Sequence, residues 1–118
     1  MAVGRGTTPE ITLTMNGETF ANSTVYVTID QGGVQITKNS YNDNGEMYLE
    51  PILDDEGTQT GTIIHLFLTQ NDTLSLDVGQ AEVQVRWIGL DQKAHKSDIS
   101  TITITRVLLE EVISYVSD

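Results

Sequence analysis

Apolar and polar residues alternate along most of this chain, which is the pattern of a half-buried β-strand. The segments 10–15 and 24–30 show it well, because each places three branched or long apolar side chains on one face: Ile11, Leu13 and Met15, then Val25, Val27 and Ile29. Similar runs predict strands over 34–37, 47–53, 62–68, 81–88 and 99–107. About seven strands in residues 10–107 indicate an all-β fold, an antiparallel β-sandwich of the immunoglobulin-like kind.

Turn residues separate these runs. Gln31-Gly32-Gly33 predicts a tight hairpin, since consecutive glycines supply the positive φ angles that hairpin turns need. Asn42-Asp43-Asn44-Gly45 predicts a second turn, and residues 54–61 a loop. Pro51 cannot donate a backbone hydrogen bond, so the strand 47–53 is expected at an edge or a bulge. The segment 62–68 is apolar on both parities except at His65, so it is expected to be covered on both faces.

Two segments carry helical signals. Thr69 followed by Asp72 fits a capping box, which predicts a single helical turn that ends near Leu76. Residues 108–118 predict a short amphipathic C-terminal helix, with Leu109, Val112, Ile113 and Val116 along one face. A helix of this length is unstable alone in water, so its apolar face must pack on the chain's own sandwich or on a neighbouring subunit. Residues 1–9, in contrast, are expected to be a flexible N-terminal arm.

Composition supports the β reading and narrows the chemistry. Thr, Ile and Val make up nearly a third of the 118 residues, and branched side chains favour strands. There is no cysteine, which excludes disulfides, thiolate metal sites and a cysteine nucleophile. No apolar run approaches the ~18 residues of a membrane span, and no secretory signal is recognisable at the N-terminus. At 13.0 kDa a folded monomer should expose roughly 6,300 Å².

Candidate chemistry is sparse. His65 has the pattern of a partly buried histidine with satisfied ring nitrogens, and His95 lies in an exposed basic loop. The stretch 42–45 resembles a calcium loop only superficially, because an EF-hand alignment puts Ser40 and Pro51 at the end positions. The acids at 54–56 have the pattern of a solvated loop. We therefore predict no catalytic, cofactor-binding or metal-binding residues, no cofactor and no enzymatic activity.

The charge distribution bears on partners. A net charge of −11 disfavours nucleic acid. Residues 41–60 hold six acids and no base, whereas residues 81–106 hold four of the six bases, so head-to-tail assembly and an ordinary acidic surface both fit. Trp87 lies on the apolar face of the strand 81–88 and is expected to anchor the core.

Four stretches in this order resemble a known group of proteins: Arg5-Gly6-Thr7-Thr8-Pro9, residues 68–74, residues 82–87 and Ser97-Asp98-Ile99. They are similar to small structural proteins encoded in the tail gene clusters of phages and prophages of Gram-positive bacteria, comparable to the N-terminal domain of phage baseplate upper proteins. The resemblance implies a β-sandwich-like component of the tail or baseplate and no catalytic or metal residues. The loop 57–61 is longer than this pattern suggests, which leaves strand order in the first half open.

From the resemblance we expect a non-enzymatic structural or adaptor component of a phage tail or baseplate, made in the bacterial cytoplasm and located in the virion. Its partners would be other virion proteins or further copies of itself, with no nucleic acid, membrane or small-molecule substrate. The alternative is an immunoglobulin-like binding module for a host-surface glycan or receptor.

Overall fold

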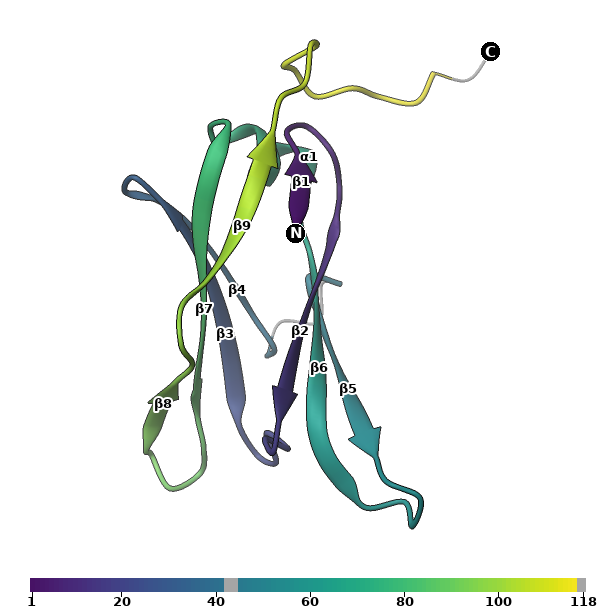
Figure 1. Ribbon diagram of the computed structural model, residues 1–118, viewed down its shortest axis with the longest axis vertical. Helices are drawn as coiled ribbons and strands as arrows, with labels where there is room; N and C mark the ends of the chain where they lie inside the picture. The colour runs from purple at the N-terminus through teal and green to yellow at the C-terminus, as the bar shows by residue number, and fades with distance from the viewer. Residues whose placement is uncertain (42–44, 117–118) are drawn as a thin grey trace.

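The computed structural model describes residues 1–41 and 45–116, and these fold into two packed β-sheets (Figure 1). The first sheet contains β1 (Ala2–Gly4), β3 (Thr24–Gln31), β4 (Val34–Asn39), β7 (Gly79–Ile88), β8 (Ala94–Lys96) and β9 (Ser100–Thr105). The second contains β2 (Glu10–Asn16), β5 (Met47–Leu53) and β6 (Gln59–Phe67), and the short helix α1 (Gln70–Leu74) lies between β6 and β7.

The strand order is that of an immunoglobulin-like sandwich. One sheet runs β2-β6-β5, and the other runs β1-β9-β7-β3-β4, with β8 paired to the far half of β7. These orders correspond to a three-strand sheet packed on an extended sheet in the immunoglobulin scheme. All pairings are antiparallel except that of β1 with β9. The predicted all-β sandwich is therefore confirmed, with nine strands in the described residues.

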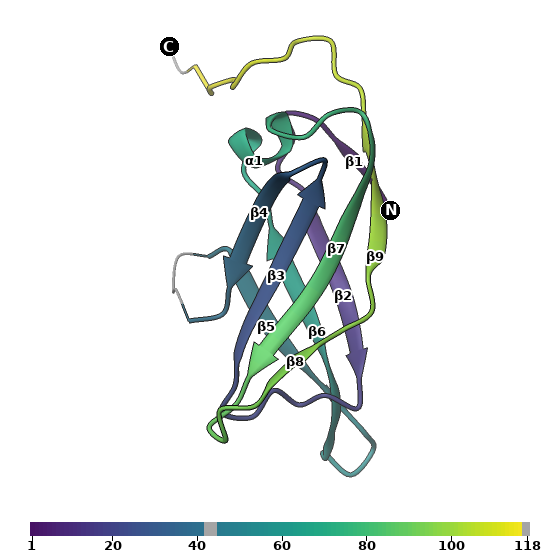
Figure 2. The same cartoon turned by 90° about the vertical axis from the view of Figure 1, so that its left-hand side faces the viewer.

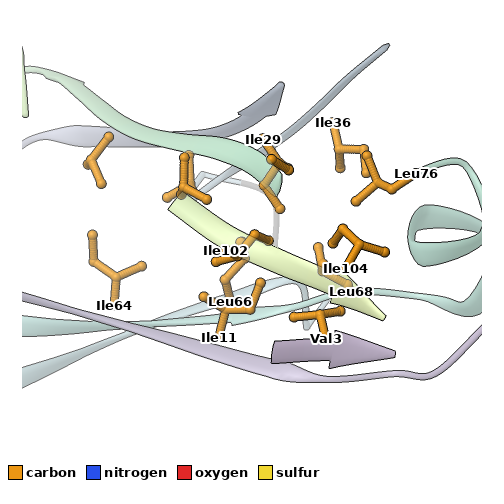
Figure 3. Close-up of a cluster of buried hydrophobic side chains, with 14 of the residues drawn as sticks. Val3, Ile11, Ile29, Ile36, Ile64, Leu66, Leu68, Leu76, Ile102 and Ile104 are labelled. Carbon is orange, nitrogen blue, oxygen red and sulfur yellow. The ribbon is translucent and has the colours of Figure 1, made fainter. Parts of the chain in front are cut away.

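The predicted alternation places the core. Val25, Val27 and Ile29 of β3 are buried between the sheets, as is Ile11 of β2, while Leu13 and Met15 pack partly buried against them. Figure 3 shows the upper part of this core, where side chains from both sheets meet side chains from the α1 region. Burial on one face of each strand is thus the force that holds the sandwich together.

Two local predictions are confirmed in detail. The β3–β4 hairpin turns at Gly32 and Gly33, whose φ angles of 57° and 94° lie in the left-handed region. Pro51 lies in β5, the edge strand of its sheet, where a missing backbone donor costs no pairing. The predicted loop 54–61 is shorter than expected, because β6 already begins at Gln59.

The prediction that residues 62–68 are covered on both faces is wrong. Thr62, Ile64 and Leu66 of β6 are buried, but Ile63 is only half-buried and Phe67 is exposed. The reason is that β6 is the centre of a three-strand sheet whose outer face has no covering layer in this fold.

The segment 1–9, predicted to be a flexible arm, is ordered against the body. Ala2–Gly4 forms β1, which pairs in parallel with β9, and Val3 is 1% exposed. Arg5 then donates from Nε to the Leu76 carbonyl (2.6 Å) and from Nη2 to the Leu74 carbonyl (2.9 Å). The arm is held because Val3 completes the core beside Ile104 and because Arg5 satisfies the last carbonyl of α1, at Leu74, and that of Leu76 just beyond it.

The helical turn after Thr69 is confirmed. Thr69 is the N-cap of α1, its hydroxyl accepts from the Asp72 amide, and the Asp72 carboxylate accepts from the Thr69 amide, which completes the capping box. Thr73 and Leu76 are fully buried, so this turn seals the end of the sandwich near β1.

The predicted C-terminal helix over 108–118 is absent from the described part of that segment. Residues 107–116 have no regular structure and extend away from the sandwich as a tail (Figures 1 and 2). The physical reason is the one that applies to all short helices: about ten residues cannot remain helical without a surface to pack on. In the described residues the segment therefore does not pack on the chain's own sandwich as a helix, one of the two expected arrangements, and contacts it through polar groups of Gln70 and Arg5.

Candidate functional site

The C-terminal segment 107–116, the tail, exposes several large apolar side chains in sequence. Its six large apolar side chains at positions 108–116 are between 51% and 93% exposed: Leu108, Leu109, Val112, Ile113, Tyr115 and Val116. The whole molecule exposes 7534 Å², above the roughly 6,300 Å² typical of a monomer of this mass. Contiguous exposed apolar surface of this kind marks an interaction site.

Two polar contacts fix where the tail leaves the body. The side-chain amide of Gln70 bonds both backbone groups of Ile113, donating to its carbonyl (3.0 Å) and accepting from its amide (2.8 Å). Arg5 pairs with Glu110 at 2.5 Å. Because these contacts use backbone and charge, the apolar side chains of the tail remain free for another surface.

A groove of about 380 Å³ lies on the outer face of the larger sheet, toward the Ile88 end of β7 and away from Gly79, which pairs with β9 near the tail. It is lined by residues of β3, β4, β7 and β8: Tyr26, Thr28, Thr37, Arg86, Trp87, Ile88 and Ala94. Cross-strand pairing brings them together, since Tyr26 pairs with Arg86 and Ile88 pairs with Ala94. The lining is mainly apolar, with the Arg86 guanidinium as its charged group.

Positive charge gathers around this groove. Arg86 of β7 lies opposite Lys96 of β8 in the antiparallel register, and both side chains are exposed. Lys93 lies one residue before β8. Three of the chain's six bases therefore lie on or beside the β7–β8 hairpin, within the base-rich segment 81–106 noted in the sequence.

Three other surface hollows have carboxylates in their linings. Asp30 and Glu82 line one on the same sheet face, Asp98 lines one between β2 and β7, and Asp91 lines one beside the β7–β8 hairpin. The groove at Arg86 differs from them in having a cation and no acid in its lining.

The hollow beside the β7–β8 hairpin, about 240 Å³, involves Trp87 and His95. Trp87 packs edge-on against the buried Phe20 (ring centroids 5.3 Å apart) and stacks on His95 (5.5 Å). Trp87 is half-buried at the end of the core, so its predicted anchoring role holds only in part. This hollow lies between the β2–β3 and β7–β8 connections, at one end of the sandwich.

His65 lies on the outer face of the smaller sheet between two carboxylates. Nδ1 pairs with Glu10 of β2, and Nε2 lies 2.8 Å from Oε1 of Glu50 in β5. Hydrogen bonds to Glu50 and then to Glu10 raise the pKa of His65 above its ordinary value, against the smaller opposing effect of burial. The prediction of a partly buried histidine with satisfied ring nitrogens is confirmed. The arrangement can hold a proton, and Tyr48 packs over the ring at 5.5 Å.

A second charged cluster was missed by the sequence reasoning. Lys38, 8% exposed, lies 2.9 Å from Asp72 and 3.1 Å from Glu46. Burial alone would lower the pKa of Lys38, but the hydrogen bonds and charges of Asp72 and Glu46 outweigh it and raise that pKa. The signal in the sequence was the parity of Lys38, which shares the inward face of β4 with Ile36.

The turn 42–45 and the acidic stretch 54–56 are the remaining candidates from the sequence. The Asn42–Gly45 turn, with its superficial calcium pattern, falls largely outside the described residues. In the 54–56 stretch, Asp54 accepts backbone hydrogen bonds from Glu56 and Thr58 (2.9 Å each), so it organises its own loop. Among residues 1–41 and 45–116, no group of three His, Asp or Glu side chains is arranged to hold a metal ion, and no helix is long and apolar enough to span a membrane.

The acidic stretch 41–60 is less available to a partner than its composition suggests. Glu46 bonds Lys38, Glu50 bonds His65, and Asp54 closes its loop. The tail has acids beside apolar side chains at Glu110, which pairs with Arg5 within the molecule, and at Glu111. No protein-family model matches this chain, and none of the curated proteins compared with it is significantly similar.

Proposed function

We propose that this protein is a non-enzymatic structural module of a phage or prophage tail or baseplate, and that it works by protein–protein assembly. The observation that carries the proposal is the tail: six large apolar side chains follow a finished sandwich and remain 51–93% exposed. An assembly module needs a stable body and an uncovered contact segment rather than a reactive pocket. The resemblance of residues 5–9, 68–74, 82–87 and 97–99 to tail-region proteins supports the viral context.

The charged clusters fit a structural role. Lys38 and His65 each have two carboxylate partners, so these groups are neutralised within the fold rather than held ready for a substrate. Both clusters also link separate elements: β4 with α1 in one case, and the three strands of the smaller sheet in the other. Such pairing favours rigidity over catalysis.

The test is the location of the protein. Phage particles induced from the bacterium that carries the gene are purified by density gradient and analysed by mass spectrometry. Antibodies raised against the purified chain then label the particles for electron microscopy. We expect stoichiometric amounts of the chain and label at the tail. Its presence in the cell lysate together with its absence from purified particles would contradict the proposal.

A second function has one observation in its favour. The hollow at Trp87 and His95 lies between the connections β2–β3 and β7–β8, which correspond to two of the antigen-binding loops of immunoglobulin variable domains. An aromatic ring at such a position suits a sugar or receptor. Light scattering together with a glycan array separates the two proposals: a strict monomer that retains a defined glycan favours the binding module, and a salt-sensitive oligomer favours assembly.

A further inference from the structure

We infer that the tail of one copy docks into the Arg86 groove of a second copy, so that the protein assembles head to tail. This inference rests on the proposed assembly function and adds the identity of the two contacting surfaces. The tail contributes its apolar side chains and two acids, and the groove contributes apolar walls and a cation.

Charge complementarity selects this groove. Glu110 and Glu111 are the charged groups of the described tail after Arg106, and the positive groups near the groove are Arg86, Lys96 and Lys93. Glu110 pairs with Arg5 within the molecule, so docking exchanges that pair for contacts with the groove, while Glu111 adds its charge. The other hollows are lined by Asp30, Glu82, Asp91 or Asp98, so an acidic segment is repelled from them. Opposite charges also raise the rate of encounter, an effect that salt reduces.

The tail cannot reach the groove of its own chain as a helix. The tail follows β9, whose Ile104 pairs with Gly79 at the start of β7, whereas the groove extends from the level of Gln84 to Ile88, five to nine residues or roughly 17–30 Å further along the strand. From Thr105 to Ile113 a helical chain advances only about 12 Å, and a fully extended one at most about 28 Å. The helical form of the tail can therefore reach this groove only on a second molecule.

Docking explains the conflict between the amphipathic pattern and the irregular tail. A surface that receives Leu109, Val112 and Ile113 supplies the packing that the short helix lacks, so folding and binding occur together. The two contacting surfaces lie at opposite ends of a molecule 48 Å long, which makes the contact heterologous. Such contacts build closed rings or open filaments. A segment of ten residues covers less than the ~800 Å² per partner of a standard interface, so the pairwise contact is weak and concentration-dependent.

The test uses full-length variants with one surface altered at a time. The tail variant is Leu109→Asp/Ile113→Asp. The groove variant is Arg86→Gln/Ala94→Glu, which lowers the net charge by two at exposed positions. Its matched control, Gln80→Glu/Thr103→Glu, lowers the charge equally on exposed residues at the far end of the same sheet. Sedimentation equilibrium over a concentration and salt series measures assembly, and circular dichroism confirms that each variant is folded.

We expect the wild type and the control to assemble as concentration rises and to dissociate in high salt. The tail variant and the groove variant should each stay monomeric. Mixed in equal amounts, they should form a 1:1 dimer and nothing larger, because each supplies the half that the other lacks. The inference is overturned if the wild type is monomeric throughout, if the groove variant assembles like the control, or if the mixture stays monomeric.

These outcomes are distinct from failure of the proposed function. A wild type that is monomeric in solution yet abundant in purified phage particles overturns the head-to-tail contact alone. Loss of the tail variant from particles that still incorporate the groove variant identifies a different virion protein as the partner of the tail. Absence of every form from the particles overturns the proposed function, whatever the purified chain does in solution.

Discussion

Lys38 of β4 joins the larger sheet to α1, with 2.9 Å between its Nζ atom and Oδ2 of Asp72. Asp72 also closes the capping box on Thr69, so one carboxylate serves both the helix terminus and a buried cation. We expect Asp72→Ala to lower the free energy of unfolding by about 2–4 kcal/mol, because it removes the carboxylate half of the capping box and leaves Lys38 with Glu46 alone. Urea denaturation measures this loss.

The pH dependence of that loss provides a second check. Burial alone would raise the pKa of Asp72, but the Thr69 amide and Lys38 outweigh it and lower that pKa below the ordinary value of 3.8. A lowered carboxyl pKa stabilises the fold above pH ~4, and the contribution disappears as pH falls through the folded-state value. The difference in the free energy of unfolding between wild type and Asp72→Ala should therefore become smaller in acid. Asp55→Ala, in an exposed loop, is the control and should change stability by less than ~0.5 kcal/mol.

Gly61 marks a close backbone approach at the centre of the smaller sheet. A Cβ atom there would lie 2.8 Å from the Met15 carbonyl oxygen and 3.3 Å from Cα of Asn16. Both neighbours are backbone, so β2 and β6 must separate to make room. We expect Gly61→Ala to destabilise the protein by about 1–3 kcal/mol in chemical denaturation. Thr60→Ala, the adjacent exposed position, should cost less than about 1 kcal/mol, and equal losses for both variants would exclude the packing explanation.

Trp87 links the core to the β7–β8 hairpin through Phe20 on one side and His95 on the other. Because the side chain is only half-buried, Trp87→Ala should cost about 2–3 kcal/mol, less than truncation of a fully enclosed tryptophan. Thermal unfolding followed by circular dichroism measures it. Trp87→Phe keeps a ring against Phe20 and should recover most of the loss. A loss above about 4 kcal/mol in Trp87→Ala would indicate full burial.

Period-two alternation was sufficient to predict most strands and their inward faces, because each strand has one buried face, as Val25, Val27 and Ile29 illustrate. Pro51 and the Gly32-Gly33 pair carried topological information for a local reason: each restricts what its own backbone can do. The capping box worked for the same reason. Features decided within a few residues of chain were accessible to sequence reasoning.

Features decided by partners distant in the sequence could not be predicted from it. β1 is three residues long, too short for any period, and it exists because β9, a hundred residues later, offers a pairing edge. The Arg86 groove is assembled from four strands, so no single segment predicts it. For the tail, the amphipathic period was recognised correctly. A short helix also needs a surface on which to pack, and the described part of this chain supplies none for it.

The Glu10–His65–Glu50 cluster makes stability depend on pH near neutrality. Both ring nitrogens of His65 donate only when the imidazole is protonated, so the two carboxylates stabilise the charged form and raise its pKa. A histidine pKa raised by folding contributes stability fully below the unfolded value near ~6.5, and the contribution is lost as pH rises through the folded value.

The Tm of the wild type should therefore fall as the pH is raised from 6 toward 8 and beyond. In His65→Gln, the part of the decrease in Tm that is due to the cluster should be absent. In His95→Gln, which leaves the cluster intact, it should remain. Glu50→Gln should show a smaller decrease in Tm than wild type, because one of the two carboxylates remains. Parallel Tm profiles for wild type and His65→Gln across that pH range would show that the cluster contributes no stability.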